Sequence, residues 1–321
     1  MTNNPNKKNL DGYVTLIAVV VLVLLNVVLL AGKMPTYYTG ILRFMGINII
    51  LAVSLNLING ITGQFSLGHA GFMAVGAYVS ALVSIHLGWP LVFALLAGAV
   101  AASLLGILIG LPTLRLRGDY LAIATLGLGE IIRVVILNLD ITKGARGLGG
   151  IPRTTTVYLV ELFAIITILF TVNLMRSTHG RALLSIREDE IAAEAMGINT
   201  TFYKVFAFSA GAFFAGIAGG LFAHSMGYIA PANFEFMRSI EILVMVVLGG
   251  LGSITGSVIA TVVLTILPEA LRGFAQYRMV LYSAMLIAIM LFRPSGLMGT
   301  RELDVRQVLG IFKTGGEKDA S

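Results

Sequence analysis

Few residues in this sequence are spaced for covalent chemistry. Ser66 and His69 lie three residues apart and could pair as a nucleophile and its base. They stand, however, in a segment with no identifiable oxyanion hole, and neither G-x-S-x-G nor H-E-x-x-H occurs in the chain. No second histidine or carboxylate has a spacing suited to a shared metal ion. The sequence therefore argues against a hydrolase and predicts neither a metal nor a cofactor.

Cysteine and nucleotide chemistry are excluded more directly. The chain has no cysteine, so it can form no disulfide, thiolate metal site or cysteine nucleophile. It also lacks the G-x-x-x-x-G-K-[ST] pattern of a P-loop. The segment from Gly250 to Gly256 comes nearest to G-x-G-x-x-G, but it is one residue too long and has no Rossmann context. ATP binding is therefore not expected in this chain.

An uncharged polar segment, 56–71, interrupts the apolar sequence with four glycines, amides and hydroxyls. Its most prominent polar residues are Asn56, Asn59, Gln64, Ser66 and His69. Such backbone is tolerated at membrane depth only where protein or a watery cavity satisfies its hydrogen bonds. The segment thus predicts a broken or re-entrant element, and an ordinary tight turn is the alternative.

Ionisable residues inside apolar runs form a second group. Three of them are glutamates: Glu130, Glu161 and Glu241. Each would cost about 2–3 kcal/mol at the centre of a bilayer unless it is paired or hydrated. Arg133 is a local partner for Glu130, and Glu241 follows Arg238 and Glu235 at three-residue steps. Structural ion pairing is the prediction for both sites. For His69 and His224, near the ends of apolar runs, we expect polar capping.

The most informative segment is charged and lies between two long apolar runs, at 185–197. Ser185 and Glu188 match the S-x-x-E capping box, and Gly197 is a helix stop. The pattern predicts a helix over 186–196, about 16 Å long at 1.5 Å per residue. It would be either a contact for a soluble partner that transmits force or a solvated helix at the membrane surface.

Composition identifies the class of protein that must position these residues. Hydrophobic residues make up 57% of the chain and charged residues only 12%. These values predict an all-α polytopic membrane bundle rather than a soluble domain. The net charge of +6 is explained by basic loops that face an anionic membrane surface, so no nucleic acid is expected.

About ten hydrophobic segments can be assigned, several of them short or broken. They cover 13–32, 41–58, 70–87, 91–111, 120–138, 157–175, 204–223, 238–251, 254–271 and 279–292. The distribution of Lys and Arg predicts both termini and the loop 176–203 on the cytoplasmic side, although Lys143, Arg146 and Arg153 argue against it. Short cytoplasmic tails are expected at 1–12 and 298–321, flanking a membrane domain at 13–297.

Small residues recur every fourth position in three stripes. The stripes are Gly98, Ala102, Gly106 and Gly110; Gly211, Ala215, Gly219 and Ala223; and Gly252, Gly256 and Ala260. Such stripes let helix backbones approach closely within a membrane, so we expect helix–helix packing surfaces. A substrate groove lined by glycine is the alternative. The stretch from Gly249 to Gly256 further predicts a hairpin between short helices.

Five separated motifs resemble one known family. They are S-L-N-L-I-N-G-I-T-G-Q-F-S-L-G-H-A-G-F-M-A-V-G-A-Y at 54–78 with R-G-D-Y-L-A-I-A-T-L-G at 117–127, I-T-K-G-A-R-G-L-G-G-I-P at 141–152, R-E-D-E-I-A-A-E-A-M-G at 187–197, and F-R-P-S-G-L at 292–297. Together they resemble the membrane subunits of branched-chain amino acid ABC importers, in particular the LivM type. The resemblance runs from about residue 40 to residue 297.

The resemblance implies a permease in a bacterial plasma (inner) membrane that forms a translocation pathway with a second, LivH-type permease. Two cytoplasmic ATP-binding subunits would drive it, and an extracytoplasmic binding protein would deliver Leu, Ile or Val. By resemblance, the ATPase-coupling residues are Arg187, Glu188, Asp189, Glu190, Ala193, Glu194 and Gly197. The E-A-A…G…I-x-L-P loop of other ABC importers is not reproduced here.

We expect the polar segment to border the pathway, because a zwitterion needs hydrogen bonds without a fixed charge that would trap it. The expected pathway residues are Asn56, Asn59, Gln64, Ser66, His69 and Glu130. Two alternatives stay open: a permease of the same family for urea or short amides, and a secondary transporter. The second would require an intramembrane carboxylate relay or inverted halves, and neither is clear in the sequence.

Overall fold

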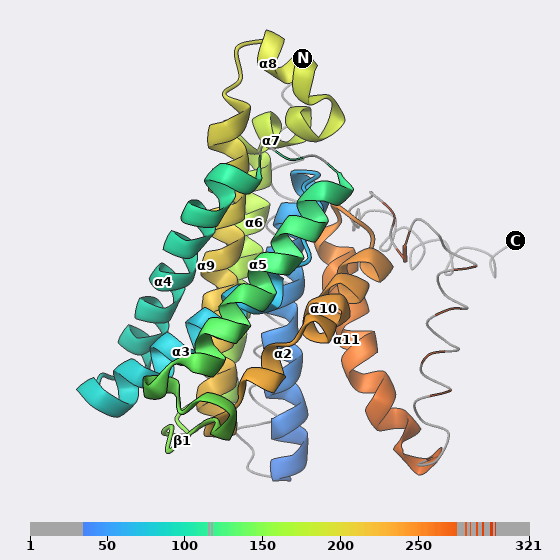
Figure 1. Cartoon of the computed structure of the whole chain (residues 1–321). Coiled ribbons are helices and arrows are strands. Elements are labelled where there is room, and N and C mark those ends of the chain that lie inside the picture. Colours follow the sequence, from blue (N-terminus) through green and yellow to red (C-terminus); the bar gives the residue numbers. More distant parts are fainter. Residues whose placement is uncertain are drawn as a thin grey trace, which may run out of the picture. The chain divides into compact units, whose positions relative to one another are not determined.

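The computed structural model describes residues 35–274, apart from 115 and 117, and scattered positions between 280 and 299. Residues 41–300 form one compact unit. The predicted first span at 13–32, the two tails and most of the predicted span at 279–292 lie outside the described residues. Helices dominate the compact unit, as the composition predicts (Figure 1).

Six helices are long and apolar enough to cross a membrane. They are α2 (Thr36–Asn56) continued by η1 (Leu57–Ile61), α3 (His69–Leu87), α4 (Leu91–Thr113), α5 (Asp119–Asn138), α6 (Val157–Arg176) and α9 (Thr200–Met226). Two shorter helices, α10 (Phe236–Gly249) and α11 (Ile254–Ala270), follow. The described residues therefore form a polytopic helical bundle with six long helices, fewer than the ten expected segments.

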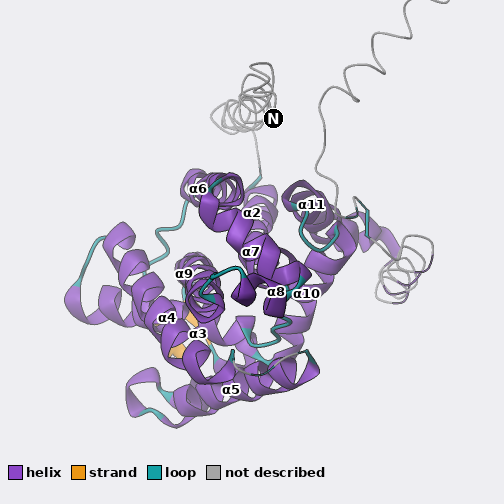
Figure 2. Cartoon of the chain, turned by 90° about the horizontal axis from the view of Figure 1, so that it is seen from above, coloured by secondary structure: helices purple, strands orange, loops and turns teal. Residues whose placement is uncertain are grey.

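The centre of the packing is the contact of α9 with α3 and α4, which lie beside it in both views (Figures 1 and 2). Glycine makes this contact possible. A Cβ atom on Gly219 would lie 1.9 Å from the carbonyl oxygen of Met73, and one on Gly216 would lie 2.8 Å from the Cβ of Ala102. Gly98 meets the Gly76 carbonyl in the same way, at 2.6 Å. The first two stripes are therefore packing surfaces, as predicted.

The third stripe was predicted wrongly in part. Gly252 precedes α11 and has a φ of +91°, a left-handed conformation that glycine adopts without strain. It forms the turn between α10 and α11 and does not belong to a helical stripe. Gly256 does pack closely, because a Cβ there would lie 2.2 Å from the Gly249 oxygen. The predicted hairpin of short helices is confirmed, and Ser253 caps α11 by accepting the Gly256 N–H.

The end of the bundle away from α7 and α8 carries the only strands among the described residues (Figure 1). β1 (Leu148–Gly149) pairs antiparallel with β2 (Tyr228–Ile229). Three single-turn helices adjoin them: η2 (Asp140–Thr142), η3 (Gly144–Arg146) and η4 (Pro231–Phe234). A fourth, η5 (Leu271–Phe274), follows α11. The Tyr228 hydroxyl donates to the Arg146 carbonyl at 2.8 Å, which joins the two loops.

Candidate functional site

The first described span is broken at the predicted place. α2 ends at Asn56, and the chain continues as the π-helix η1 before it becomes irregular at 62–68. In this wider helix the Thr62 N–H reaches the Leu57 carbonyl at 3.3 Å, and Gly63 then turns the chain with a φ of +72°. α3 begins at His69. π-Helical turns are rare and frequently occur at functional sites.

After the break the chain folds back along the helix that it has just left. The Asn59 side chain donates to the Ser66 carbonyl and accepts from the Ser66 N–H, both at 3.2 Å. One step further on, His69 Nε2 lies 2.9 Å from the hydroxyl of Ser54 in α2. Helix α5 covers the returning chain, because Thr125 accepts the Leu67 N–H at 3.0 Å. The predicted broken element is therefore confirmed, and an ordinary tight turn is not observed.

Several polar groups of this segment are buried without a hydrogen-bond partner in the described part of the chain. They are both amide atoms of Gln64, the hydroxyl of Ser66 and Nδ1 of His69. A buried polar atom left unsatisfied costs about 1–3 kcal/mol, so these groups need water, a solute or another chain. The Ser66 hydroxyl is not hydrogen-bonded to His69, whose Nε2 faces Ser54 instead. The pairing of Ser66 with His69 is thus not observed.

The histidines connect segments rather than cap helices. Gly68, not His69, is the residue before α3, and no side chain caps this helix. His224 Nδ1 lies 3.0 Å from the Pro152 carbonyl, and its Nε2 lies 3.4 Å from the Ser84 hydroxyl. The capping expectation was wrong because both rings are buried between helices. The two nitrogens of His224 reach different segments, whereas His69 contacts Ser54 through Nε2 alone.

Asn56 ties the end of α2 to the distant hairpin. Its side-chain oxygen accepts the Gly252 N–H and its amide donates to the Ser253 carbonyl, each at 2.9 Å. Gly60 approaches the same turn closely, since a Cβ atom on Gly60 would lie 2.3 Å from the Gly252 nitrogen. The broken span and the α10–α11 hairpin are therefore held together at one point.

The charged segment differs from its prediction. It consists of two helices, α7 (Thr178–Glu188) and α8 (Glu190–Ala195), which lie together at one end of the bundle (Figure 1). Asp189 separates them, because its carboxylate accepts the N–H groups of Ile191 and Ala192 and caps α8. The Ser185 hydroxyl donates to the Ala182 carbonyl inside α7, so the predicted capping box is absent. Gly197, with a φ of +83°, lies just beyond the end of α8, as expected of a helix stop.

The side chains of α8 divide into an anchored set and an exposed set. Ala193 is buried, and Glu190 accepts a hydrogen bond from Lys204 of α9 at 2.5 Å. Glu194 is exposed, as are Ile191 and Met196, whose exposed fractions are 67% and 83%. The α7–α8 end of the bundle therefore exposes two large apolar side chains near acidic residues.

Arg187 connects the charged segment to the broken span. Its Nη1 donates to the Gly60 carbonyl at 2.9 Å, and its Nε lies 3.5 Å from the Glu188 carboxylate. The side chain passes between two glycines: a Cβ on Gly63 would lie 3.0 Å from its Cγ, and one on Gly252 would lie 2.7 Å from Nη1. The sequence predicted Arg187 only as a coupling residue. Nothing in it indicated this contact, because Gly60 is 127 residues away.

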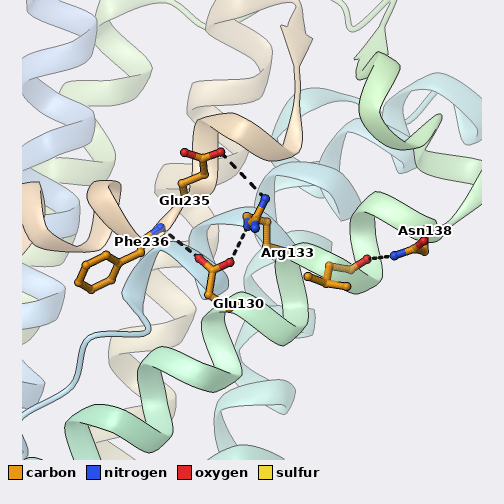
Figure 3. Close-up of polar contacts among 6 residues, drawn as sticks. Glu130, Arg133, Asn138, Glu235 and Phe236 are labelled. Carbon is orange, nitrogen blue, oxygen red and sulfur yellow. Dashed lines mark hydrogen bonds and ion pairs between the residues drawn. The ribbon is translucent and has the colours of Figure 1, made fainter.

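Glu130 belongs to a separate ionic cluster (Figure 3). Its carboxylate accepts from Arg133 Nε at 2.7 Å and from the Phe236 N–H at 3.2 Å, and Arg133 lies 4.0 Å from Glu235. These hydrogen bonds do not involve the polar residues of the broken span. The pairing predicted for Glu130 is confirmed, and so is that of Glu241, which Arg238 contacts at 2.8 Å.

Glu161 on α6 is buried. The six long apolar helices, the first of which breaks into a polar segment, define a multi-pass membrane protein. Within the described residues, no three His, Cys, Asp or Glu side chains are grouped to hold a metal.

Comparison with known proteins identifies the family. Residues 37–292 match the family described as the branched-chain amino acid transport system permease component, and the chain belongs to this family. It is 39% identical to the high-affinity branched-chain amino acid transport permease LivM of Salmonella typhimurium and 37% identical to LivM of Escherichia coli K12. Each alignment covers 78% of this chain and 68% of the relative.

A second type of permease is also similar. LivH of Escherichia coli K12 is 28% identical, over 79% of this chain and 92% of the relative. No solved structure matches the chain. Membership of the family makes the protein a multi-pass membrane transport permease of the LivM type, as the sequence motifs implied.

Proposed function

We propose that this chain is a permease subunit of an ATP-driven importer for leucine, isoleucine and valine. The observation that carries the proposal is the identity of 37–39% to two LivM permeases over most of the chain. The names of these relatives favour branched-chain amino acids over urea or short amides. The orphaned Gln64, Ser66 and His69 side chains support a polar route past the broken span, bordered also by Asn56 and Asn59.

The partner permease in this proposal is a LivH-type subunit, and it covers the face of α5 and α10. Charged groups that are partly exposed within a membrane span are unfavourable against hydrocarbon. Glu130 and Arg133 have side chains 32% and 26% exposed at this face (Figure 3). By contrast, the exposed large side chains of α4 are all apolar and suit lipid. Glu130 thus borders the interface between the two permeases, where the pathway runs.

The α7–α8 segment is the proposed docking surface for the ATP-binding subunits, on the cytoplasmic side. Its exposed tip supports this role, and Arg187 provides a direct connection from the tip to the broken span. The opposite end, with β1 and β2, would then receive the extracytoplasmic binding protein. The distribution of basic residues supports this orientation in a bacterial plasma membrane.

Reconstituted transport tests the proposal. Proteoliposomes that contain this chain, a LivH-type permease, two ATP-binding subunits and a binding protein should accumulate labelled leucine only with ATP. Unlabelled isoleucine and valine should compete, whereas urea and acetamide should not. A companion variant replaces Glu194, the exposed glutamate of α8, with lysine, which reverses a charge on the proposed docking surface and should abolish stimulated hydrolysis. ATP-dependent uptake of urea but not of leucine would refute the assignment of the substrate.

A further inference from the structure

A row of five charged side chains runs from α5 to α10. Their signs alternate, and the charged row consists of Glu130, Arg133, Glu235, Arg238 and Glu241. The first three are linked by contacts of 2.7 Å and 4.0 Å, and the last two by a contact of 2.8 Å. Three carboxylates therefore face two guanidinium groups, which leaves the charged row with one negative charge in excess.

Glu235 is the carboxylate that carries this excess. The Arg133 Nη1 approaches it only to 4.0 Å, whereas the Arg133 Nε donates to Glu130 at 2.7 Å (Figure 3). The N-terminus of α10 adds about half a positive charge, but the Phe236 N–H donates to Glu130 rather than to Glu235. Among the described residues, Glu235 thus has no cation closer than 4.0 Å, and its side chain is 55% exposed.

Arg238, the other arginine of the charged row, is engaged elsewhere. Its Nη1 donates to Glu241 at 2.8 Å, and its Nη2 donates to the side-chain oxygen of Asn48 at 2.7 Å. The Arg238 side chain is only 19% exposed, so these two contacts hold it within the bundle. A cation for Glu235 is therefore not supplied by the charged row itself.

Glu235 lies at the depth of the α5 span rather than at a membrane surface. Glu130, whose carboxylate contacts the residue next to Glu235, is 11 residues from the start of α5 and 8 from its end. At 1.5 Å per residue these separations are about 16 Å and 12 Å. A charge this far inside a span is unfavourable against lipid, and such charges pair with one another or face water.

A cavity of about 280 Å³ lies beside Glu235 and is lined from α2, α9, η4 and α10. Its charged lining consists of Glu235, Arg238 and Glu241, with a net charge of −1, and Phe44 and Met237 add apolar surface. Pockets for drug-sized ligands measure about 300–1,000 Å³, so this cavity suits a smaller group. A lysine or arginine side chain matches it, because its stem is apolar and its head is cationic.

We propose that Glu235 binds a lysine or arginine side chain of the partner permease, in the cavity beside α10. The inference rests on the proposed function, because it takes the second permease as the subunit that covers α5 and α10. The incoming cation neutralises the excess negative charge of the charged row, and its apolar stem covers Phe44 and Met237. The ion pair that this chain lacks is thereby formed across the interface.

The same charges determine which permease is a suitable partner. Two copies of this chain joined through α5 and α10 would each bring an excess negative charge to the interface. Like charges that meet in an interface disfavour association, whereas excess charges of opposite sign favour it. Glu235 therefore selects a cationic partner permease against a second copy of this chain.

Dissociation of the assembled transporter tests the role of Glu235. The complete transporter is held through a tag on this chain, and the release of a fluorescent partner permease is followed after dilution in detergent. Glu235→Gln should speed release at least about thirtyfold, because it leaves the cation of the partner unpaired in the interface.

Glu241→Gln is the matched control for this measurement. The Glu241 side chain is 54% exposed, like that of Glu235, but it is paired with Arg238 of the chain itself. Loss of a largely exposed ion pair has a small effect, so release should change less than about fivefold.

Charge reversal identifies the cation of the partner and guards against a folding defect. Glu235→Lys should prevent stable assembly, because it places two cations opposite each other. Each Lys and Arg within the membrane spans of the partner permease is then changed to Glu, one at a time. At one position the change should restore assembly with Glu235→Lys and weaken it with the wild-type chain. A restored complex also shows that the Glu235→Lys chain folds.

Three results would overturn the inference. Unchanged release in Glu235→Gln would mean that Glu235 faces the water of the pathway or is protonated. Equal acceleration by Glu235→Gln and Glu241→Gln would mean that the charged row acts as a whole rather than through Glu235. Restoration at no position of the partner would exclude a cationic side chain as the occupant.

Leucine uptake by the same wild-type complexes separates this inference from the proposed function. Absence of uptake by a complex whose assembly depends on Glu235 would contradict the proposed function alone. Uptake by a complex whose assembly does not depend on Glu235 would contradict the inference alone.

Discussion

Replacing Arg187 with methionine should uncouple ATP hydrolysis from transport. The substitution keeps an unbranched side chain between Gly63 and Gly252 but removes the hydrogen bond from Nη1 to the Gly60 carbonyl, which is 2.9 Å long. That bond is a direct polar contact between the α7–α8 segment and the π-helical end of the first described span. Without it, a movement of α7–α8 is transmitted to the broken span through apolar packing, in which Leu183 of α7 contacts Leu57 and Ile61.

The expected loss of coupling in Arg187→Met follows from the free energy of the hydrogen bond that is removed. Hydrogen bonds to charged groups contribute about 1.5–3 kcal/mol, and the partial exposure of Arg187, 27%, places this one near the lower value. Each 1.4 kcal/mol changes an equilibrium about tenfold. We therefore expect the ratio of leucine transported to ATP hydrolysed to fall about tenfold in Arg187→Met.

The assay measures both quantities in the same proteoliposomes, with labelled leucine and released phosphate. Glu188→Gln is the comparison, since within this chain it affects only the 3.5 Å contact of Arg187 with a carboxylate that is 74% exposed. Exposed ion pairs contribute about 0–1 kcal/mol, so this variant should change the ratio much less. If Arg187→Met transports leucine with the same ratio as the wild type, the contact with Gly60 plays no part in coupling.

Three further predictions concern packing, charge and the pathway. Gly219→Ala should lower the yield of assembled complex, because its Cβ would lie 1.9 Å from the Met73 oxygen. Gly127→Ala is the control and should leave the yield unchanged, because the space around Gly127 is open. Equal yields of the two variants would contradict the packing role of Gly219. Glu130→Gln should lower the thermal stability of the complex, because it weakens the 2.7 Å ion pair with Arg133. The double variant Glu130→Arg with Arg133→Glu should regain part of that stability in a thermal unfolding assay. If it regains none, Glu130 does not stabilise the complex through this ion pair. Cysteines placed singly at positions 56–71 should react with a water-soluble reagent, at rates that depend on the nucleotide state of the ATP-binding subunits. If these cysteines stay unreactive in every state while cysteines in flanking loops react, the pathway lies elsewhere.

Much of the fold could be predicted because it depends on local sequence. Apolar runs of sufficient length identified the six long helices, and the stripes that contain Gly98, Gly106 and Gly219 identified packing surfaces on two of them. The break after Asn56 could also be predicted, since uncharged polar backbone at membrane depth has few other solutions. What the sequence did not indicate is that the break begins as a π-helix, which no simple periodicity encodes.

The sequence-based predictions failed where two local capping signals compete, or where a contact joins residues that are distant in the sequence. Ser185 and Glu188 fit a capping box, but Ser177 begins a helix earlier and Asp189 offers a carboxylate that accepts two backbone N–H groups. The Asp189 cap therefore divides the segment into two helices, α7 and α8. The contacts of Asn56 with the 252–253 turn and of Arg187 with Gly60 join residues more than a hundred positions apart, and only the folded chain reveals them.

Site-specific cross-linking tests the central claim most directly, namely that the α7–α8 tip is the surface that meets the ATP-binding subunits. Met196→Cys, at a position 83% exposed, and Trp89→Cys, 48% exposed between α3 and α4 at the opposite end, would each carry a photoreactive benzophenone in the assembled transporter. We predict that the probe at 196 captures an ATP-binding subunit and that the probe at 89 does not. Capture of the ATP-binding subunit from position 89, with none from position 196, would contradict the account.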